Sequence, residues 1–173
     1  MNELHQLDFQ SPVGIIEITG DAKSIHSILF MERTEPLHLL HGETPQPLQQ
    51  CALQLDEYFR GERTDFDLPL YAAGTPFQQQ VWQALMEVGY AKTASYKDIA
   101  VSIGKDKAVR AVGSANSKNK LTIVVPCHRV IGSNGKLTGY AGSLERKDWL
   151  LQHERAVRER QVDLQAAAAE PQV

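Results

Sequence analysis

The sequence predicts a mixed α/β fold of the α+β type, with antiparallel strands in its first part and helices in its second. Residues 4–30 contain short segments of alternating apolar and polar residues separated by turn signals, which is typical of an antiparallel meander. After residue 74, segments with apolar residues at helical spacing begin with capping signals. The 173 residues suffice for one large domain or two small ones.

The first part, residues 1–73, is expected to be an α/β scaffold domain that carries no obvious chemistry. Strands are predicted over residues 4–10, 15–19 and 24–30. A helix is predicted from Leu48 to Arg60, because apolar residues recur there at helical spacing and Gly61 follows. A short apolar strand is predicted over residues 66–70.

The second part, residues 74–157, is expected to form a domain whose first helices are placed by their caps. Thr75 and Gln78 form a predicted capping box, with Pro76 at the first helical position, and Gly89 is expected to end this helix. Ser95 begins a second box and a short helix that ends at Gly104. A third helix is predicted over residues 107–116, capped by Asp106.

The last two of these helices, joined by a turn that contains glycine, are typical of a helix-turn-helix. One face of the second helix carries Lys107, Arg110 and Ser114 at spacings of three and four. Residues 76–157 hold 12 Lys and Arg against 6 Asp and Glu, a net charge of +6, whereas residues 1–75 have a net charge of −8. This asymmetry favours contact between the second part and phosphate. The alternatives are ordinary surface charge and a helical hairpin that binds nothing.

One segment of this second part combines a buried strand with reactive side chains. Residues 122–125 are apolar and mostly β-branched, which predicts a short buried strand that Pro126 ends. Cys127 and His128 are therefore expected on a turn, held rigidly and exposed. A thiolate is a nucleophile, and a nearby His or Arg lowers the thiol pKa. Because neighbours on a strand face opposite ways, His128 reaches the thiol only if the backbone turns or a water bridges them. The alternative is a buried, inert cysteine with two solvated polar neighbours.

A glycine-rich segment and a last helix complete the second part. Asn134 and Gly135 are a hairpin signal, and residues 139–142 surround one tyrosine with minimal side chains, which lets a flat ligand approach the backbone. The alternative for that segment is a flexible turn. Ser143 is predicted to cap the last helix, whose ordered part is expected to end at Glu154. Residues 158–173 are expected to be a frayed helical or disordered tail.

Several functional classes are disfavoured by composition. No apolar run approaches the ~18 residues of a membrane span, and no apolar signal segment opens the sequence, so a cytoplasmic location without membrane contact is expected. Cys51 and Cys127 lack metal-ligand spacing, and a reducing compartment disfavours a disulfide between them. His38 and His41 are interpreted as a solvated stretch, so neither a metal nor a cofactor is expected.

Taken together, the motifs of the second part resemble the O6-alkylguanine-DNA alkyltransferases (methylated-DNA–protein-cysteine methyltransferases) of the bacterial single-function type. The resemblance covers about residues 74–154 and rests on separate segments in the same order: Thr75–Gln78, Arg110–Gly113, Asn119, Pro126–Val130, Gly139–Gly142, Lys147 and Trp149–Leu151. It implies a ribonuclease H-like antiparallel-sheet domain followed by a helical domain of the winged helix-turn-helix kind.

The resemblance also implies a reaction. A monomer of this family, without a cofactor, binds double-stranded DNA from the minor groove and flips the damaged base into a pocket. It then transfers the alkyl group of O6-alkylguanine, or of O4-alkylthymine, irreversibly and once to its own cysteine. Three alternatives remain: a relative that binds alkylated DNA without transfer, a thiol hydrolase that turns over repeatedly, and a structural DNA-binding module.

Roles for individual residues follow from the same resemblance. Cys127 would accept the alkyl group, His128 would take the thiol proton through a water, and Glu154 would orient the imidazole. Asn119 would brace the site and Tyr96 would donate its hydroxyl to the guanine. Arg110 would fill the gap left in the base stack. The other expected DNA contacts are Lys107, Ser114 and Arg129, and the expected pocket residues are Val130, Tyr140, Ala141 and Gly142.

One departure concerns Ala141, which stands where some relatives have serine. With Gly142 beside it, this segment is expected to leave room for alkyl groups larger than methyl.

Overall fold

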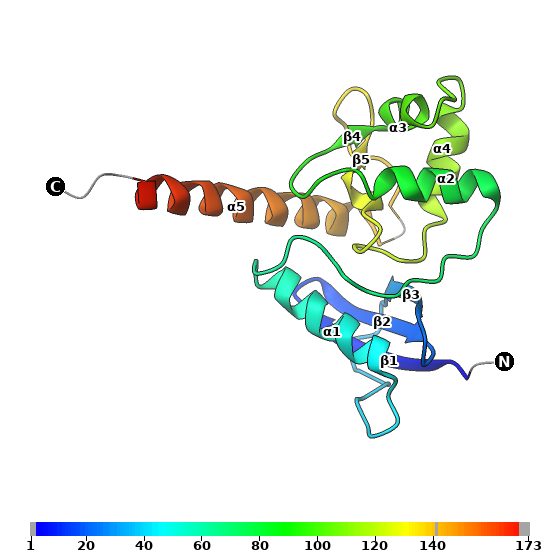
Figure 1. The fold of residues 1–173 in the computed structure, drawn as a ribbon, viewed down its shortest axis with the longest axis vertical. Helices are drawn as coiled ribbons and strands as arrows, with labels where there is room; N and C mark the ends of the chain where they lie inside the picture. The colour runs from blue at the N-terminus through cyan, green and yellow to red at the C-terminus, as the bar shows by residue number, and fades with distance from the viewer. Residues whose placement is uncertain (1–2, 141, 170–173) are drawn as a thin grey trace.

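An antiparallel sheet backed by one helix forms the N-terminal half of the chain (Figure 1). The computed structural model describes residues 3–140 and 142–169. Strands β1 (His5–Ser11), β2 (Gly14–Gly20) and β3 (Ile25–Phe30) pair in the order β1-β2-β3, and helix α1 (Gln46–Phe59) packs on this sheet. The register aligns Leu7, Ile18 and Ile28 in one buried row across the three strands. The predicted meander and helix are therefore confirmed.

The predicted strand over residues 66–70 is wrong. Only one isolated parallel bridge, between Ile25 and Leu70, forms there. Pro69 has no backbone N–H for a ladder, and its carbonyl accepts from the Ile25 amide at 2.7 Å. The backbone of Asp67 bonds instead to the side chain of Gln54 on α1. The segment is thus held to the sheet edge and to α1 without extending the sheet.

The C-terminal half is built from helices around a short two-stranded sheet (Figure 1). Helices α2 (Pro76–Leu85), α3 (Tyr96–Ser102) and α4 (Val109–Ser117) pack against one another. Strand β4 (Ala94–Ser95) pairs in parallel with β5 (Val130–Ile131), directly after the 3₁₀ turn η1 (Cys127–Arg129). The α+β class, with strands first and helices second, is confirmed.

Both predicted capping boxes are present. The Thr75 hydroxyl accepts from the Gln78 amide at 3.1 Å while the Gln78 side chain accepts from the Thr75 amide at 3.0 Å, and Ser95 and Asp98 repeat the arrangement on α3. Helix α2 ends at Leu85, before Gly89. The amides of Glu87 and Val88 donate to the carbonyls three residues earlier, as in a 3₁₀ turn, so the last turn is tighter than an α-helix.

The predicted Asp106 cap is wrong. Helix α4 begins after Ala108, whose amide donates to the Lys105 carbonyl at 2.8 Å in a separate turn. Asp106 and Lys107 lie in that turn, outside the helix.

The predicted strand over residues 122–125 is also wrong, although its burial is confirmed. The chain turns instead, with Ile123 in the left-handed region at a φ of 71°. Just before this turn, the Lys120 carbonyl accepts from the Ile28 amide at 2.8 Å, and the Thr122 amide donates to the Ile28 carbonyl at 3.3 Å. These bonds join the turn to strand β3, so the two halves of the chain meet beside the sequence that leads to Cys127.

Helix α5 (Leu144–Ala169) closes the structure and projects from its body (Figure 1). Ser143 caps it as predicted, accepting from the Arg146 amide at 3.2 Å. The helix continues past Glu154, so the expected end of the ordered helix there is wrong. The tail was expected to be either a frayed helix or disordered, and residues 158–169 are helical. Residues 170–173 of the expected tail lie outside the described residues.

Asn134 and Gly135 form a turn, but residues on its two sides form no paired strands within the described chain. No helix in the described ranges has the length and apolar character that crossing a membrane requires.

Replacing Thr75 with alanine is expected to lower the free energy of unfolding by about 1 kcal/mol, because the cap hydroxyl satisfies an amide at the start of α2. The measurement is the denaturant midpoint of the full chain. The control is Thr34→Ala, which removes the same atoms from an exposed loop residue. Equal midpoints for the two variants would contradict the assigned cap.

Candidate active site

The sulfur of Cys127 is held by an asparagine that also shapes the preceding turn. The Asn119 side-chain nitrogen donates to the Cys127 sulfur at 3.2 Å and to the Val125 carbonyl at 2.9 Å, while its oxygen accepts from the Leu121 amide at 3.0 Å. One side chain therefore spans the loop and reaches the reactive atom. The predicted bracing role of Asn119 agrees with this geometry.

Cys127 is only 2% exposed, so the expectation of an exposed thiol is wrong. Cys127 lies in the 3₁₀ turn η1, whose three residues are all buried, and not at the exposed end of a strand as expected. Burial raises the pKa of the thiol to about 11, although the Asn119 hydrogen bond and the nearby charge of Lys147 both lower it. At that pKa about one thiol in ten thousand is ionised at pH 7. The site must therefore supply a base if this sulfur is to act as a nucleophile.

His128 follows Cys127 and is fully buried. Its Nε2 lies 2.7 Å from the Glu154 Oε2, whereas its Nδ1 is buried without a hydrogen-bond partner among the described residues. Burial lowers the pKa of the imidazole, which favours the neutral form. Because an ionised carboxylate only accepts, Nε2 carries the proton and Nδ1 keeps a free lone pair. His128 is thus arranged as a base, with no direct hydrogen bond to Cys127 in the described chain.

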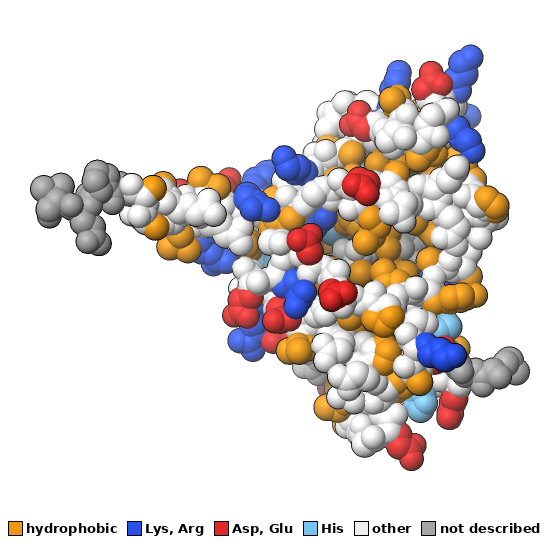
Figure 2. Space-filling model, viewed as in Figure 1, with side chains coloured by type: hydrophobic (Ala, Val, Ile, Leu, Met, Phe, Trp, Pro, Cys, Tyr) orange, Lys and Arg blue, Asp and Glu red, His pale blue; other side chains and the backbone are white. Residues whose placement is uncertain are grey.

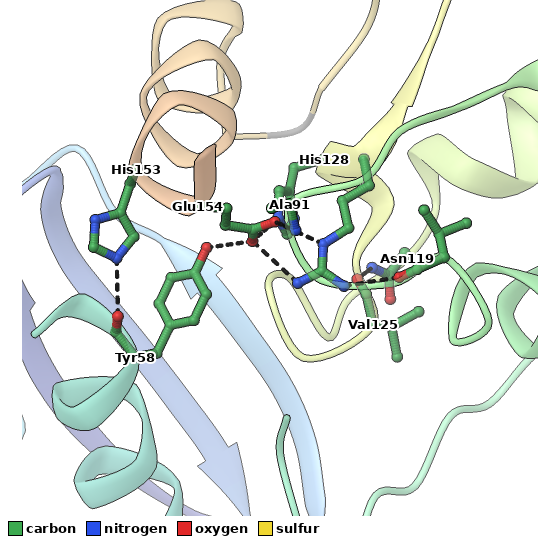
Figure 3. A network of polar contacts seen from close by, with 9 residues as sticks. Tyr58, Ala91, Asn119, Val125, His128, His153 and Glu154 are labelled. Carbon is green, nitrogen blue, oxygen red and sulfur yellow. Dashed lines mark hydrogen bonds and ion pairs between the residues drawn. The ribbon is translucent and has the colours of Figure 1, made fainter. Parts of the chain in front are cut away.

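Glu154, on α5, lies at the centre of the polar network (Figure 3). Its carboxylate is fully buried and accepts from the Tyr58 hydroxyl at 2.6 Å, the Arg129 guanidinium at 2.8 and 3.1 Å, and the Ala91 amide at 3.2 Å, besides its contact with His128. Burial alone would raise the pKa of Glu154, but His128 and Arg129 outweigh it and hold the pKa well below its usual range. The carboxylate is therefore ionised throughout the physiological range.

Arg129 is a predicted DNA contact, but the structure contradicts this assignment. The side chain is 6% exposed and binds Glu154 with two nitrogens. Its third nitrogen donates to the Val88 carbonyl at 2.8 Å, and its guanidinium lies 5.6 Å from the ring centre of Tyr90. With these contacts made, Arg129 neutralises the buried carboxylate, and its burial keeps the guanidinium away from the surface that a phosphate would approach.

Besides Arg129, two more donors to Glu154 were not predicted from the sequence. Tyr58 lies 96 residues away on α1, and the amide of Ala91 points at the carboxylate from a left-handed turn with a φ of 61°. A backbone donor has no residue-type signal at all. The only sequence signal for Tyr58 is a tyrosine at an apolar position of the predicted helix over residues 48–60.

The segment after Cys127 is tied down by a buried lysine. The Lys147 ammonium donates to the carbonyls of Val130 at 2.5 Å and Thr138 at 2.8 Å, and burial lowers its pKa to about 8. The Thr138 hydroxyl bonds to the Tyr96 hydroxyl at 3.0 Å. Tyr96 and Val130, two predicted site residues, are thus connected through this segment.

Tyr140 and Gly142 close the segment against the N-terminal half. The Tyr140 hydroxyl is buried without a partner among the described residues, and burial raises its pKa well above the usual range. A Cβ on Gly142 would lie 2.6 Å from the Phe30 ring and 2.9 Å from that of Tyr140. The space beside Gly142 is therefore filled by these two rings, and the room for larger alkyl groups stays a prediction. Ala141 lies outside the described residues.

The expected DNA-contacting residues of the helix-turn-helix are exposed. Arg110 and Ser114 lie on α4 and Lys107 in the turn before it. Figure 2 shows Lys and Arg side chains gathered at the end of the molecule where α3 and α4 lie. On the same helix, Gly113 faces the Tyr96 ring, which a Cβ would approach to 3.8 Å. Helix α4 therefore connects the exposed basic residues to the predicted pocket.

One cluster outside this site has the composition of a metal centre. Asp8, Glu17 and His38 bring their ligand atoms within 4.8 Å of one another. Arg33 already binds both carboxylates, at 2.5 and 2.9 Å to Asp8 and 2.9 Å to Glu17. The positive charge at this position is therefore a guanidinium of the chain itself.

Comparison with known proteins agrees with these features. Residues 5–72 match the family model described as "6-O-methylguanine DNA methyltransferase, ribonuclease-like domain", and residues 76–156 match the model of its DNA binding domain. A relative from Methanosarcina barkeri, named methylated-DNA–protein-cysteine methyltransferase, is 46% identical over 84% of this chain and 93% of its own. A constitutive enzyme of the same name from Bacillus subtilis is 60% identical over 66% of this chain and 70% of its own.

Solved structures give the same result. The crystal structure of Mycobacterium tuberculosis O6-methylguanine methyltransferase matches with a TM-score of 0.79 and 40% identity, covering 89% of this chain and 94% of that one. The structure of the M. tuberculosis protein in complex with DNA also has a TM-score of 0.79, with 43% identity over 88% and 94% of the two chains. The chain therefore belongs to the 6-O-methylguanine DNA methyltransferase family.

Proposed function

We propose that this protein repairs DNA by transferring the alkyl group of O6-alkylguanine, or of O4-alkylthymine, to the sulfur of Cys127, once and irreversibly. The observation that supports the proposal is the arrangement around this sulfur. Asn119 donates to it, and the next residue, His128, has its Nε2 bound to Glu154 and its Nδ1 without a hydrogen-bond partner among the described residues. The protein acts as a monomer on double-stranded DNA and uses no cofactor.

The transfer is a substitution at carbon. His128 accepts the thiol proton through a bridging water, because its free Nδ1 makes no direct bond to Cys127. The sulfur then forms a bond to the alkyl carbon while the bond from that carbon to O6 breaks. The electron pair passes to the guanine, which takes up a proton at a ring nitrogen and leaves as a neutral base. The Tyr96 hydroxyl donates the proton to that nitrogen and takes one back from solvent, while the imidazolium, balanced by Glu154, releases to solvent the proton that it took from the thiol.

DNA is bound through α4. Lys107, Arg110 and Ser114 face the minor groove, and Arg110 enters the stack in place of the flipped base. The base reaches a sulfur that is 2% exposed, so the side chains around Cys127 are displaced when it enters. Tyr140 and Val130 then form walls of the pocket, and Ala141, which lies outside the described residues, is expected beside them.

The first prediction concerns the site of transfer. After exposure to duplex DNA that contains O6-methylguanine, the intact mass is expected to rise by one methyl group, and peptide mapping places it on Cys127. Cys51, the other cysteine, lies on the buried face of α1, where its pKa is raised to about 12 by burial, and it serves as the internal control. Cys127→Ala is expected to take no methyl group while binding the same DNA nearly as well. More than one turnover per chain, or a methyl group on another residue, would contradict the proposal.

The second prediction concerns the base. In His128→Gln the transfer rate at pH 7 is expected to fall by about 10²- to 10³-fold, because the proton acceptor is lost. Only direct ionisation of the thiol remains, and its pKa of about 11 lies far above pH 7. The rate of the variant is therefore expected to rise about tenfold per unit between pH 7 and 9. A variant with the same pH profile as the wild type would exclude His128 as the base.

The third prediction concerns base flipping. Arg110→Ala is expected to slow repair of duplex DNA by at least about tenfold, and to leave reaction with the free base O6-benzylguanine nearly unchanged, because only the duplex has a stack to fill. The control is Arg155→Ala, which removes an exposed arginine from α5. Equal slowing with both substrates would show that Arg110 acts on the chemistry or the fold instead.

A further inference from the structure

We propose that Tyr58, on α1 of the N-terminal half, is a positioning residue of the transfer reaction that acts through Glu154 and sets the proton affinity of His128. The inference deepens the proposed function and rests on it. It assigns to the N-terminal half a direct contribution to the chemistry, in addition to its packing against the C-terminal half.

The geometry places the Tyr58 hydroxyl on the oxygen that faces the imidazole. Tyr58 Oη lies 2.6 Å from the Glu154 Oε2, and His128 Nε2 lies 2.7 Å from the same oxygen (Figure 3). All three side chains are fully buried. A donor to an ionised oxygen draws negative charge from it, so the hydroxyl weakens the support that Glu154 gives to an imidazolium. It also fixes the carboxylate plane from the side opposite to η1.

The hydroxyl stays a donor across the working range of pH. Burial, and then the charge of Glu154, raise the pKa of Tyr58 well above its usual value. The other charged groups that face His128 are Arg129 on η1 and Lys147 on α5, and both oppose its protonation. Arg158, also on α5, acts on the nearby Tyr90 ring at 5.5 Å. Tyr58 therefore adds a group from the N-terminal half to the groups of the C-terminal half that act on His128.

The ring of Tyr58 is held independently of its hydroxyl. It lies 5.2 Å from the ring centre of Phe59, 5.7 Å from that of Phe66 and 5.4 Å from that of His153. His153 also bonds to the Tyr58 carbonyl at 2.9 Å. A phenylalanine would fill the same aromatic cluster, so packing alone does not account for a hydroxyl placed on a buried charge.

A second tyrosine in the same cluster provides a matched control. The Tyr90 ring centre lies 6.3 Å from that of Tyr58, and its hydroxyl is also buried. This hydroxyl has no hydrogen-bond partner among the described residues, so it does not reach Glu154. Tyr90→Phe therefore removes the same atom from the same environment without changing the carboxylate.

The experiment compares full-length wild type, Tyr58→Phe and Tyr90→Phe. The imidazole of His128 is titrated by ¹⁵N-histidine NMR, with its signals assigned through His128→Gln, and the alkylation rate with O6-benzylguanine is measured against pH. In Tyr58→Phe, the pKa of His128 and the midpoint of the acid limb of the rate are both expected to move upward by about half to one unit, because Oε2 loses a donor. Tyr90→Phe is expected to move neither.

A third variant reverses the sign. 3,5-Difluorotyrosine at position 58 keeps the ring and makes the hydroxyl a stronger donor, so both midpoints are expected to move downward. This variant also provides the test if Tyr58→Phe does not fold. Unchanged midpoints in the position-58 variants, or an equal shift in Tyr90→Phe, would overturn the inference. Failure of the proposed function is a different result, since the wild type would then gain no mass on Cys127.

Discussion

The burial of one ionised carboxylate constrains the rest of this structure. Removing a carboxylate from water costs several kcal/mol unless nearly every lone pair meets a donor. Glu154 meets this requirement with donors from α1, from the turn after α2 and from η1. These elements lie far apart in the chain, so only the folded chain places their donors around the carboxylate. The left-handed Ala91 is consistent with this, because its strained backbone is held where its amide reaches the carboxylate.

The same burial determines the chemistry of the neighbours. Because both groups are buried, the thiol of Cys127 and the imidazole of His128 favour their neutral forms: burial raises the pKa of the thiol and lowers that of the imidazole. A proton that passes from sulfur to imidazole creates two charges at once. Glu154 stabilises the imidazolium, and the donor from Asn119 stabilises the thiolate. Under the proposed mechanism, the rate of transfer depends on how far those two contacts favour the charged pair.

Local signals predicted much of the fold and only part of the site. The capping boxes at Thr75 and Ser95 and the alternation of the N-terminal strands were readable because each depends on residues within one turn or one strand. Residues 122–125 have the composition of a strand, but Asn119 bonds to both ends of the turn they form, and that tertiary contact overrides propensity. Arg129 follows the reactive pair as a DNA contact would, yet a carboxylate 25 residues away binds it. Tyr58 could not be found locally, since only the folded chain places it on Glu154.

The contacts around the sulfur divide into a rigid set and a weaker one. Asn119, His128, Arg129 and Glu154 are all buried and bonded to backbone or to one another, so they hold the reacting atoms in place. The covering segment has fewer restraints: Lys147 to the Thr138 carbonyl, Thr138 to Tyr96, and Arg146 to the Gly142 carbonyl. Single hydrogen bonds contribute about 1 kcal/mol each to stability, more where a charge takes part. Opening the network of Glu154 would expose an unpaired charge. We therefore infer that, in the proposed reaction, a base would enter by displacing this segment and leave the network of Glu154 in place.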